Sequence, residues 1–194
     1  MFRMSSASEP LKGLNEVSRE LAKAKGAAPV HLWNPPFCGD INMRISADGL
    51  WHYMNSPIGR MPLVKLFSSI LRLDDDGKYY LVTPVEKCGI LVDDAPFLAI
   101  RMRVEGRCTA QVVTFETQVD DEVAVGPEHS LRFVDEAGTG GLKPYVLVRN
   151  NLEALISRAL FYDLVGLGTV EGDWFGVWSS GQFFPMKKAA DVQF

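Results

Sequence analysis

The sequence has few cysteines and no pattern that would use them together. Its 194 residues include three, Cys38, Cys88 and Cys108, which are far apart and form no C-x-x-C pair. This spacing argues against a disulfide framework or a zinc ribbon, and we expect three reduced thiols in a cytoplasmic protein. No run of eighteen apolar residues exists, and the first residues lack the apolar region of a signal peptide. We therefore expect neither a membrane-spanning helix nor a membrane partner.

An excess of basic residues is also missing. The formal net charge is −4, and charged residues make up 23% of the chain. A dedicated DNA-binding protein usually carries a basic excess or a dense basic stripe, so any nucleic-acid surface here has to be local. With 47% hydrophobic residues, the chain can build the core of one large domain or two small ones.

Motifs for metal, nucleotide or nucleophilic chemistry are absent. The stretch "LDDDG" fails as a calcium loop because Arg72 and Thr83 stand where acidic ligands are required. The glycines of "GLGTVEG" follow a predicted helix, whereas a Rossmann turn follows a strand, and "GTGG" lacks the lysine of a P-loop. The three histidines form no H-x-x-x-H pair, and no G-x-S-x-G motif is present. We expect no cofactor and no metal, and we assign no catalytic residue.

The first half of the sequence predicts a hairpin followed by a helix. In "DINMRISADGLWHYMN", a three-residue loop over 47–49 pairs Ile45 with Trp51 and Met43 with Tyr53, which gives one wholly apolar face. Pro62 is suited to the first turn of a helix over 62–73. Two strands, "KYYLV" and "CGILV", follow. An amphipathic helix over 10–25 precedes the whole arrangement.

The second half predicts a similar order of elements. A hairpin over 96–118 turns at residues 105–107 and sets Val104 opposite Cys108, and a second hairpin turns at the glycines of "GTGG". A helix then covers 150–168, with Asn150 and Glu153 at capping-box spacing, and two short strands end the chain.

The two halves therefore suggest an internal duplication. Each has a hairpin with a glycine turn, then an arginine (Arg60 or Arg149), a helix, an acidic turn and aromatic strands. We predict an α+β fold of two tandem related units over residues 1–96 and 97–194, each with antiparallel hairpins packed on a helix. The alternative is that two similar units arise without common ancestry, because hairpins packed on a helix are a common way to cover a sheet.

Several motifs resemble those of the bacterial domain-of-unknown-function family 1285. They are "WNPP", "GDINMRI", "DGLWHY", "SPIGR", "TPVEK", "VDDAPF" and "PYVLVRNNLEA", and they extend from about Trp33 to the C-terminus. The resemblance implies an α+β fold with an internal duplication and a C-terminal half superficially like pleckstrin-homology folds. It also implies a ligand surface between the domains and a role in signalling through a protein or nucleic-acid partner.

These observations favour a non-enzymatic binding or regulatory protein. Arginines beside helix starts can hold a carboxylate or phosphate group, and exposed aromatic rings can form the walls of a site. The predicted ligand- or partner-binding residues are Trp33, Arg44, Trp51, Tyr53, Arg60, Glu86, Asp94, Tyr145 and Arg149. Two alternatives stay open: an enzyme of unfamiliar type acting on a small anionic substrate, and a nucleic-acid binder using Arg101 and Arg103.

Overall fold

A computed structural model describes residues 28–136, 138 and 141–192 of the chain. The chain divides into two compact units, the first formed by residues up to Ser46 with Leu50–Asp93 and the second by Ala47–Gly49 with the residues from Asp94 onward. Strands predominate in both, and two α-helices lie within the described residues, so the fold is α+β as predicted. Neither helix has the length and apolar character needed to cross a membrane. The helix predicted over 10–25 lies outside the described residues.

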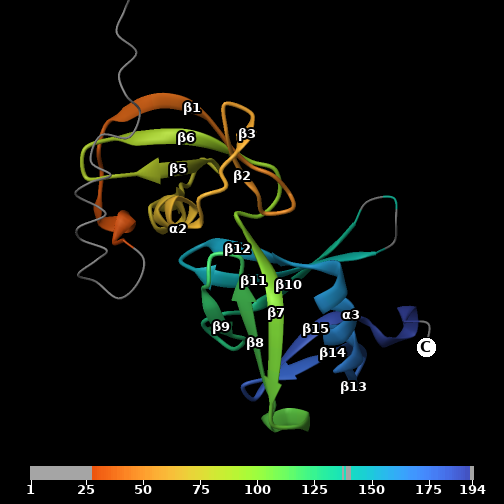
Figure 1. Cartoon of the computed structure of the whole chain (residues 1–194). Helices are drawn as coiled ribbons and strands as arrows, with labels where there is room; N and C mark the ends of the chain where they lie inside the picture. The colour runs from red at the N-terminus through yellow and green to blue at the C-terminus, as the bar shows by residue number, and fades with distance from the viewer. Residues whose placement is uncertain (1–27, 137, 139–140, 193–194) are drawn as a thin grey trace, which may run out of the picture. The chain divides into compact units, whose positions relative to one another are not determined.

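The first unit is a six-stranded sheet in the order β3-β2-β1-β6-β5-β4. The central strands β1 and β6 run parallel, and the other neighbours run antiparallel. The helix α2 (Met61–Ser69) covers one face of this sheet (Figure 1). The strands are β1 (Phe37–Ile45), β2 (Trp51–Tyr53), β3 (Ser56–Pro57), β4 (Leu71–Leu73), β5 (Tyr79–Val82) and β6 (Lys87–Val92), and a short 3-10 helix, η1 (Val30–Leu32), precedes them.

The β1–β2 hairpin has the predicted register. Ile45 lies opposite Trp51 and Met43 opposite Tyr53, and Gly49 has a φ of +79°, a backbone conformation that glycine adopts without strain. Trp51 is only 2% exposed, and its ring stacks on that of Phe67 in α2 at a centroid distance of 6.1 Å. Met43, Ile45 and Trp51 of the predicted apolar face are therefore buried, whereas Tyr53 at the end of β2 is exposed.

The helix α2 is shorter than predicted. It has Pro62 in its first turn, as expected, but it ends at Ser69 because Leu71–Leu73 forms β4, which pairs with β5. Leu71 is 1% exposed. Burial of this side chain in the sheet outweighs the continuation of the helical periodicity.

The second unit contains two sheets and the helix α3 (Arg158–Gly166). Its six-stranded sheet has the order β10-β11-β12-β7-β8-β9, in which only β12 and β7 run parallel, and a three-stranded antiparallel sheet has the order β13-β14-β15. The strands are β7 (Phe97–Glu105), β8 (Val112–Thr117), β9 (Glu122–Ala124), β10 (Leu131–Asp135), β11 (Leu142–Arg149), β12 (Leu152–Ile156), β13 (Thr169–Glu171), β14 (Trp174–Ser179) and β15 (Gln182–Lys188); the 3-10 helices are η2 (Cys108–Ala110) and η3 (Ala189–Asp191).

The predicted turn of the β7–β8 hairpin is wrong. Val104 lies opposite Val113, not Cys108, and the connection contains the 3-10 helix η2. The observed register buries Val113 and Phe115 completely. Because these side chains are larger and more apolar than Cys108 and Ala110, their burial stabilises the longer connection over the tight turn.

The predicted helix over 150–168 is also wrong in its first half. Leu152–Ile156 forms β12, with alternating buried positions, and α3 starts only at Arg158, after Ser157. Asn150 has a φ of +50° in the turn between β11 and β12 and does not cap a helix. Arg149 therefore ends a strand, whereas Arg60 directly precedes α2. The predicted equivalence of these two arginines is wrong.

Ser179 joins the two sheets of the second unit. Its hydroxyl is fully buried; it accepts a bond from the Val113 amide at 2.9 Å and donates to the Val125 carbonyl at 2.8 Å. Buried polar groups satisfied in this way fix the relative position of the elements that they connect. The three-stranded sheet is thus anchored to the six-stranded sheet, and α3 packs beside β14.

Candidate functional site

Two of the predicted site residues, Asp94 and Tyr145, are in direct contact in the second unit. The Tyr145 hydroxyl donates to Asp94 Oδ1 at 2.7 Å, and Lys143 Nζ donates to Asp94 Oδ2 at 2.8 Å. Lys143 and Tyr145 are two residues apart on β11, so both side chains project from the same face of the sheet. Both oxygens of the Asp94 carboxylate are therefore engaged by donors from one strand.

A second cation completes this group. Arg132 on β10 lies opposite Tyr145, and its guanidinium is 4.4 Å from the centroid of the Tyr145 ring. Arg132 also makes two parallel bonds to Glu153 of β12, at 2.8 and 2.5 Å, the bidentate geometry that best holds a guanidinium in place. We call Asp94, Arg132, Lys143, Tyr145 and Glu153 the Asp94 cluster.

The cations of the Asp94 cluster are its outermost groups. The side chains of Arg132 and Lys143 are 50% and 41% exposed, whereas those of Glu153 and Asp94 are 27% and 13% exposed. The carboxylates therefore lie below the cations and hold them in position. N–H donors on Arg132 and Lys143 stay accessible to a ligand, because neither side chain is covered by its partner.

The electrostatics of the cluster keep every donor charged or protonated. Burial, together with the hydrogen bond to Asp94, raises the pKa of the Tyr145 hydroxyl well above its usual value. The bond to Asp94 likewise raises the pKa of Lys143, and the bonds to Glu153 raise that of Arg132. The cluster therefore presents the same set of donors throughout the physiological pH range.

A related arrangement occurs in the first unit. Arg72 on β4 lies opposite Tyr80 on β5, as Arg132 lies opposite Tyr145. The Tyr80 hydroxyl donates to Asp76 at 2.7 Å, which with burial raises the pKa of Tyr80 to about 12. Arg72 and Lys87 both pair with Asp74, at 2.5 and 2.9 Å. In this group the Arg72 donors are used within the protein, because Arg72 also donates to the main-chain carbonyls at positions 30 and 33.

We expect the stability of the protein to fall in acid because of Asp74. Burial alone raises the pKa of this carboxyl, but the hydrogen bonds and charges of Arg72 and Lys87 outweigh it and lower the pKa below its usual 3.8. A lowered pKa stabilises the fold above the unfolded-state value, and this contribution is lost as the pH falls through the folded-state value. Urea midpoints measured by circular dichroism between about pH 7 and pH 2.5 should therefore decline below about pH 5.

Asp74→Asn should lower the stability at neutral pH by about 1–3 kcal/mol and flatten this decline. Asp75→Asn, which changes an exposed carboxylate in the same turn, is the matched control and should keep the wild-type profile. Equal acid sensitivity in wild type and Asp74→Asn would contradict the assignment to Asp74.

Two of the predicted arginines, Arg44 and Arg149, form ion pairs outside the Asp94 cluster. Arg149 pairs with Asp121, and its guanidinium lies 4.6 Å from the centroid of the Phe97 ring. Arg44 makes two bonds to Asp93, at 2.8 and 2.6 Å. Neither arginine is part of the Asp94 cluster.

The remaining predicted residues have varied environments in the first unit. Trp51 is a core residue. Tyr53 and Arg60 are exposed, with Arg60 at the N-terminus of α2. Trp33 is half-buried and its carbonyl accepts the bond from Arg72. Glu86 is buried in the β5–β6 turn, where its amide donates to the Thr83 hydroxyl.

Sequence reasoning missed Arg132, Lys143 and Glu153. Arg132 and Lys143 lie on the predicted hairpin of β10 and β11, but the connection between Asp135 and Leu142 is too long to fix one register, so the sequence alone does not place Arg132 opposite Tyr145. Glu153 gives no signal either, because the periodicity of 150–168 predicts a helix there. Its position on β12 depends on the parallel pairing of β12 with β7, which has no local signal.

Two family models match consecutive parts of the chain. The N-terminal domain of the domain of unknown function DUF1285 matches residues 28–95, and the C-terminal domain of the protein of unknown function DUF1285 matches residues 96–186. The chain belongs to the DUF1285 family. Among the described residues of this DUF1285 protein, no group of three or more His, Cys, Asp or Glu side chains could hold a metal ion.

Two solved structures of DUF1285 proteins are similar to this one. The protein from Silicibacter pomeroyi DSS-3 is 51% identical over 93% of this chain and 98% of its own, with a TM-score of 0.84. The protein from Shewanella baltica OS155 is 26% identical over 65% of this chain and 91% of its own, with a TM-score of 0.51. No curated protein matches the chain.

Proposed function

We propose that this DUF1285 protein is a non-enzymatic binding or regulatory protein that recognises a carboxylate or phosphate group through the Asp94 cluster. The observation that carries the proposal is the layering of this cluster. Two half-exposed cations, Arg132 and Lys143, lie above less exposed carboxylates that orient them. Oriented N–H donors bind anions more tightly than mobile surface lysines, because less side-chain entropy is lost on binding.

The contrast with the first unit supports this reading. Arg72 and Lys87 are only 17% and 22% exposed, and Arg72 is used to hold main-chain carbonyls. The same Arg–Tyr strand pair thus has a structural task in one unit, while its counterpart in the other leaves two cations accessible. A purely structural role would not require the side chains of Arg132 and Lys143 to be exposed, whereas binding of an anion would.

We also propose that the two units arose by duplication, and strand order supports this. If β1–β6 correspond in order to β7–β12, the two six-stranded sheets have the same topology, with a parallel pair at the centre and a three-stranded meander on each side. Residues with positive φ recur at three equivalent turns: Gly49 and Gly106, Asn55 and Asp120, and Gly77 and Gly138. In this correspondence Arg72–Tyr80 and Arg132–Tyr145 are equivalent.

The resemblance stated from the sequence adds further parts to the proposal. The first is a likeness of the C-terminal unit to pleckstrin-homology folds, which its antiparallel sheets and single described helix support. The other two are a role in signal transduction and a cytoplasmic location. A ligand surface between the domains stays a prediction.

The proposal is tested by NMR titration of the ¹⁵N-labelled full chain with inorganic phosphate, citrate, cyclic AMP and a short single-stranded oligonucleotide. We expect at least one of these anions to shift the amide resonances around Arg132, Lys143 and Tyr145. The double variant Arg132→Gln/Glu153→Gln removes one cation and its carboxylate together, so the net charge is unchanged. It should weaken that binding about tenfold or more, because a charge-assisted contact is lost.

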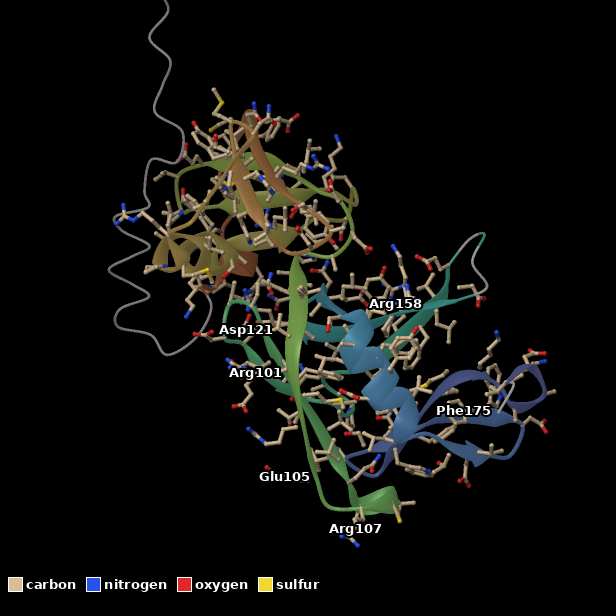
Figure 2. All side chains as sticks on the ribbon, turned by 45° about the vertical axis from the view of Figure 1, so that its right-hand side comes forward. Arg101, Glu105, Arg107, Asp121, Arg158 and Phe175 are labelled. Atoms are coloured by element: carbon tan, nitrogen blue, oxygen red, sulfur yellow. The ribbon has the colours of Figure 1, made fainter. Side chains whose placement is uncertain are left out.

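Arg103→Gln/Glu122→Gln is the matched control, because Arg103 is an exposed strand arginine of the same unit that pairs with Glu122, and this double variant also leaves the net charge unchanged. Loss of oligonucleotide binding in this control variant alone would favour the nucleic-acid alternative, which uses the β7–β8 hairpin. Figure 2 shows Arg101 and Glu105 on the β7–β8 hairpin. Anion binding that the first double variant does not weaken would refute the assignment to the Asp94 cluster.

A further inference from the structure

A pocket in the second unit is separate from the Asp94 cluster. It has a volume of about 230 Å³ and lies where α3, β14, β15, the start of β11 and η3 meet. Phe175, labelled in Figure 2 on the β14–β15 part of the chain, and Met186 are its buried walls. The other apolar side chains that line it are Leu142, Phe161, Val165 and Val192.

A β-bulge directs a lysine toward this apolar pocket. Phe175 on β14 lies opposite Lys187, but the next residue, Gly176, lies opposite Pro185, so Met186 is the extra residue of the bulge. In a regular strand, Met186 and Lys187 would face opposite sides of the sheet. Both line the pocket here, and bulges that redirect a side chain are frequent beside functional sites.

The Lys187 ammonium has no hydrogen bond and no ion pair with any residue in the described ranges. Asp191 also lines the pocket, but it is exposed and forms no salt bridge with Lys187. A lysine beside an apolar surface usually extends its ammonium into water or finds a carboxylate. Lys187 is half-buried, so a bound anion would supply a partner that the described residues do not.

Gly168 helps to shape the pocket. A side chain at this position would place its Cβ 2.1 Å from the Phe175 ring, so the ring rests directly on the main chain after α3. Any larger residue at position 168 would push the Phe175 ring out of this position. The glycine thus keeps one wall of the pocket in place.

We propose that this pocket binds a small amphipathic carboxylate, whose hydrocarbon part lies against Phe161, Phe175 and Met186 and whose carboxylate pairs with Lys187. At about 30 Å³ for each water-sized group, the volume suits a body of about six to ten carbon atoms. Ligand sites typically combine mostly apolar walls with one or two polar groups that fix the orientation of the ligand. This site does not depend on the function proposed for the Asp94 cluster.

The test is an NMR titration of the full chain with octanoate and with its neutral analogue octanamide. Octanoate should shift resonances of α3, β14 and β15 and give intermolecular contacts with the Met186 and Val165 methyl groups. Lys187→Met should weaken octanoate binding about tenfold and leave octanamide binding unchanged. Asp191→Asn should strengthen octanoate binding about two- to threefold, because it removes a like charge near the carboxylate.

The exposed neighbour Lys188 provides the matched control, and Lys188→Met should bind octanoate like wild type. Val165→Trp should fill the pocket and abolish octanoate binding. If the circular dichroism spectrum of this variant differs from that of wild type, the contacts of octanoate with the Met186 and Val165 methyl groups locate the binding site instead. Three results would each overturn the proposal. They are equal affinities for octanoate and octanamide, equal effects of Lys187→Met and Lys188→Met on octanoate binding, and no octanoate binding at about 10 mM.

Discussion

Trp51→Ala is expected to destabilise the protein by about 3–5 kcal/mol, the usual cost of removing a buried tryptophan. Trp51 is 2% exposed and lies against the Phe67 ring of α2. Its removal leaves a cavity between the β1–β2 hairpin and the helix that the rigid sheet cannot close. The loss is a large part of the 5–15 kcal/mol by which single domains are stable.

Urea unfolding followed by far-UV circular dichroism measures this loss, and NMR shows which resonances disappear first. Tyr53→Ala, which changes an exposed residue of the same strand, is the control and should cost less than about 1 kcal/mol. The comparison also separates two roles for Trp51. A wall of a ligand site, as predicted from the sequence, could be truncated at little cost in stability, whereas a core residue could not.

The sequence allowed the β1–β2 hairpin to be predicted residue by residue because its information is local. A one-residue slip would put Ile45 and Trp51 on opposite faces of the sheet, so the burial of one face selects a single register. The α+β class and the strand pair β5–β6 followed from alternation and turn residues in the same way. The parallel pairs β1–β6 and β12–β7 have no such local signal, because their partners are far apart in the chain.

The segment 150–168 shows why a periodic pattern can be misread. Leu152, Ile156 and Leu160 are spaced by four, a multiple of the strand period of two and close to the helical period of 3.6. Pairing with β7 decides for a strand up to Ile156. That single error hid Glu153 and made Arg149 resemble Arg60. Of the Asp94 cluster, only Asp94 and Tyr145 are among the residues predicted from the sequence.

Gly176→Ala is expected to cost about 3 kcal/mol or more, at the upper end for the addition of one methyl group to a packed interior. The new Cβ would lie 2.3 Å from the Phe184 carbonyl oxygen and 2.9 Å from Pro185 Cα. Both are main-chain atoms of β15 that cannot rotate away, unlike the end of a flexible side chain. The strands β14 and β15 would have to separate, and the walls of the pocket beside Lys187 would move with them.

Gly166→Ala, at the end of α3, is the matched control, because no atom lies within 4 Å of a Cβ added there. It should change the stability by less than about 1 kcal/mol, in the stabilising direction, since alanine favours the helix more than glycine does. Urea midpoints of the two variants give the comparison, and the amide resonances of β13–β15 should shift only in Gly176→Ala. A Gly176→Ala variant as stable as Gly166→Ala would mean that β15 does not pack against the main chain of β14 as closely as described, and the bulge that directs Lys187 into the pocket would lose its support.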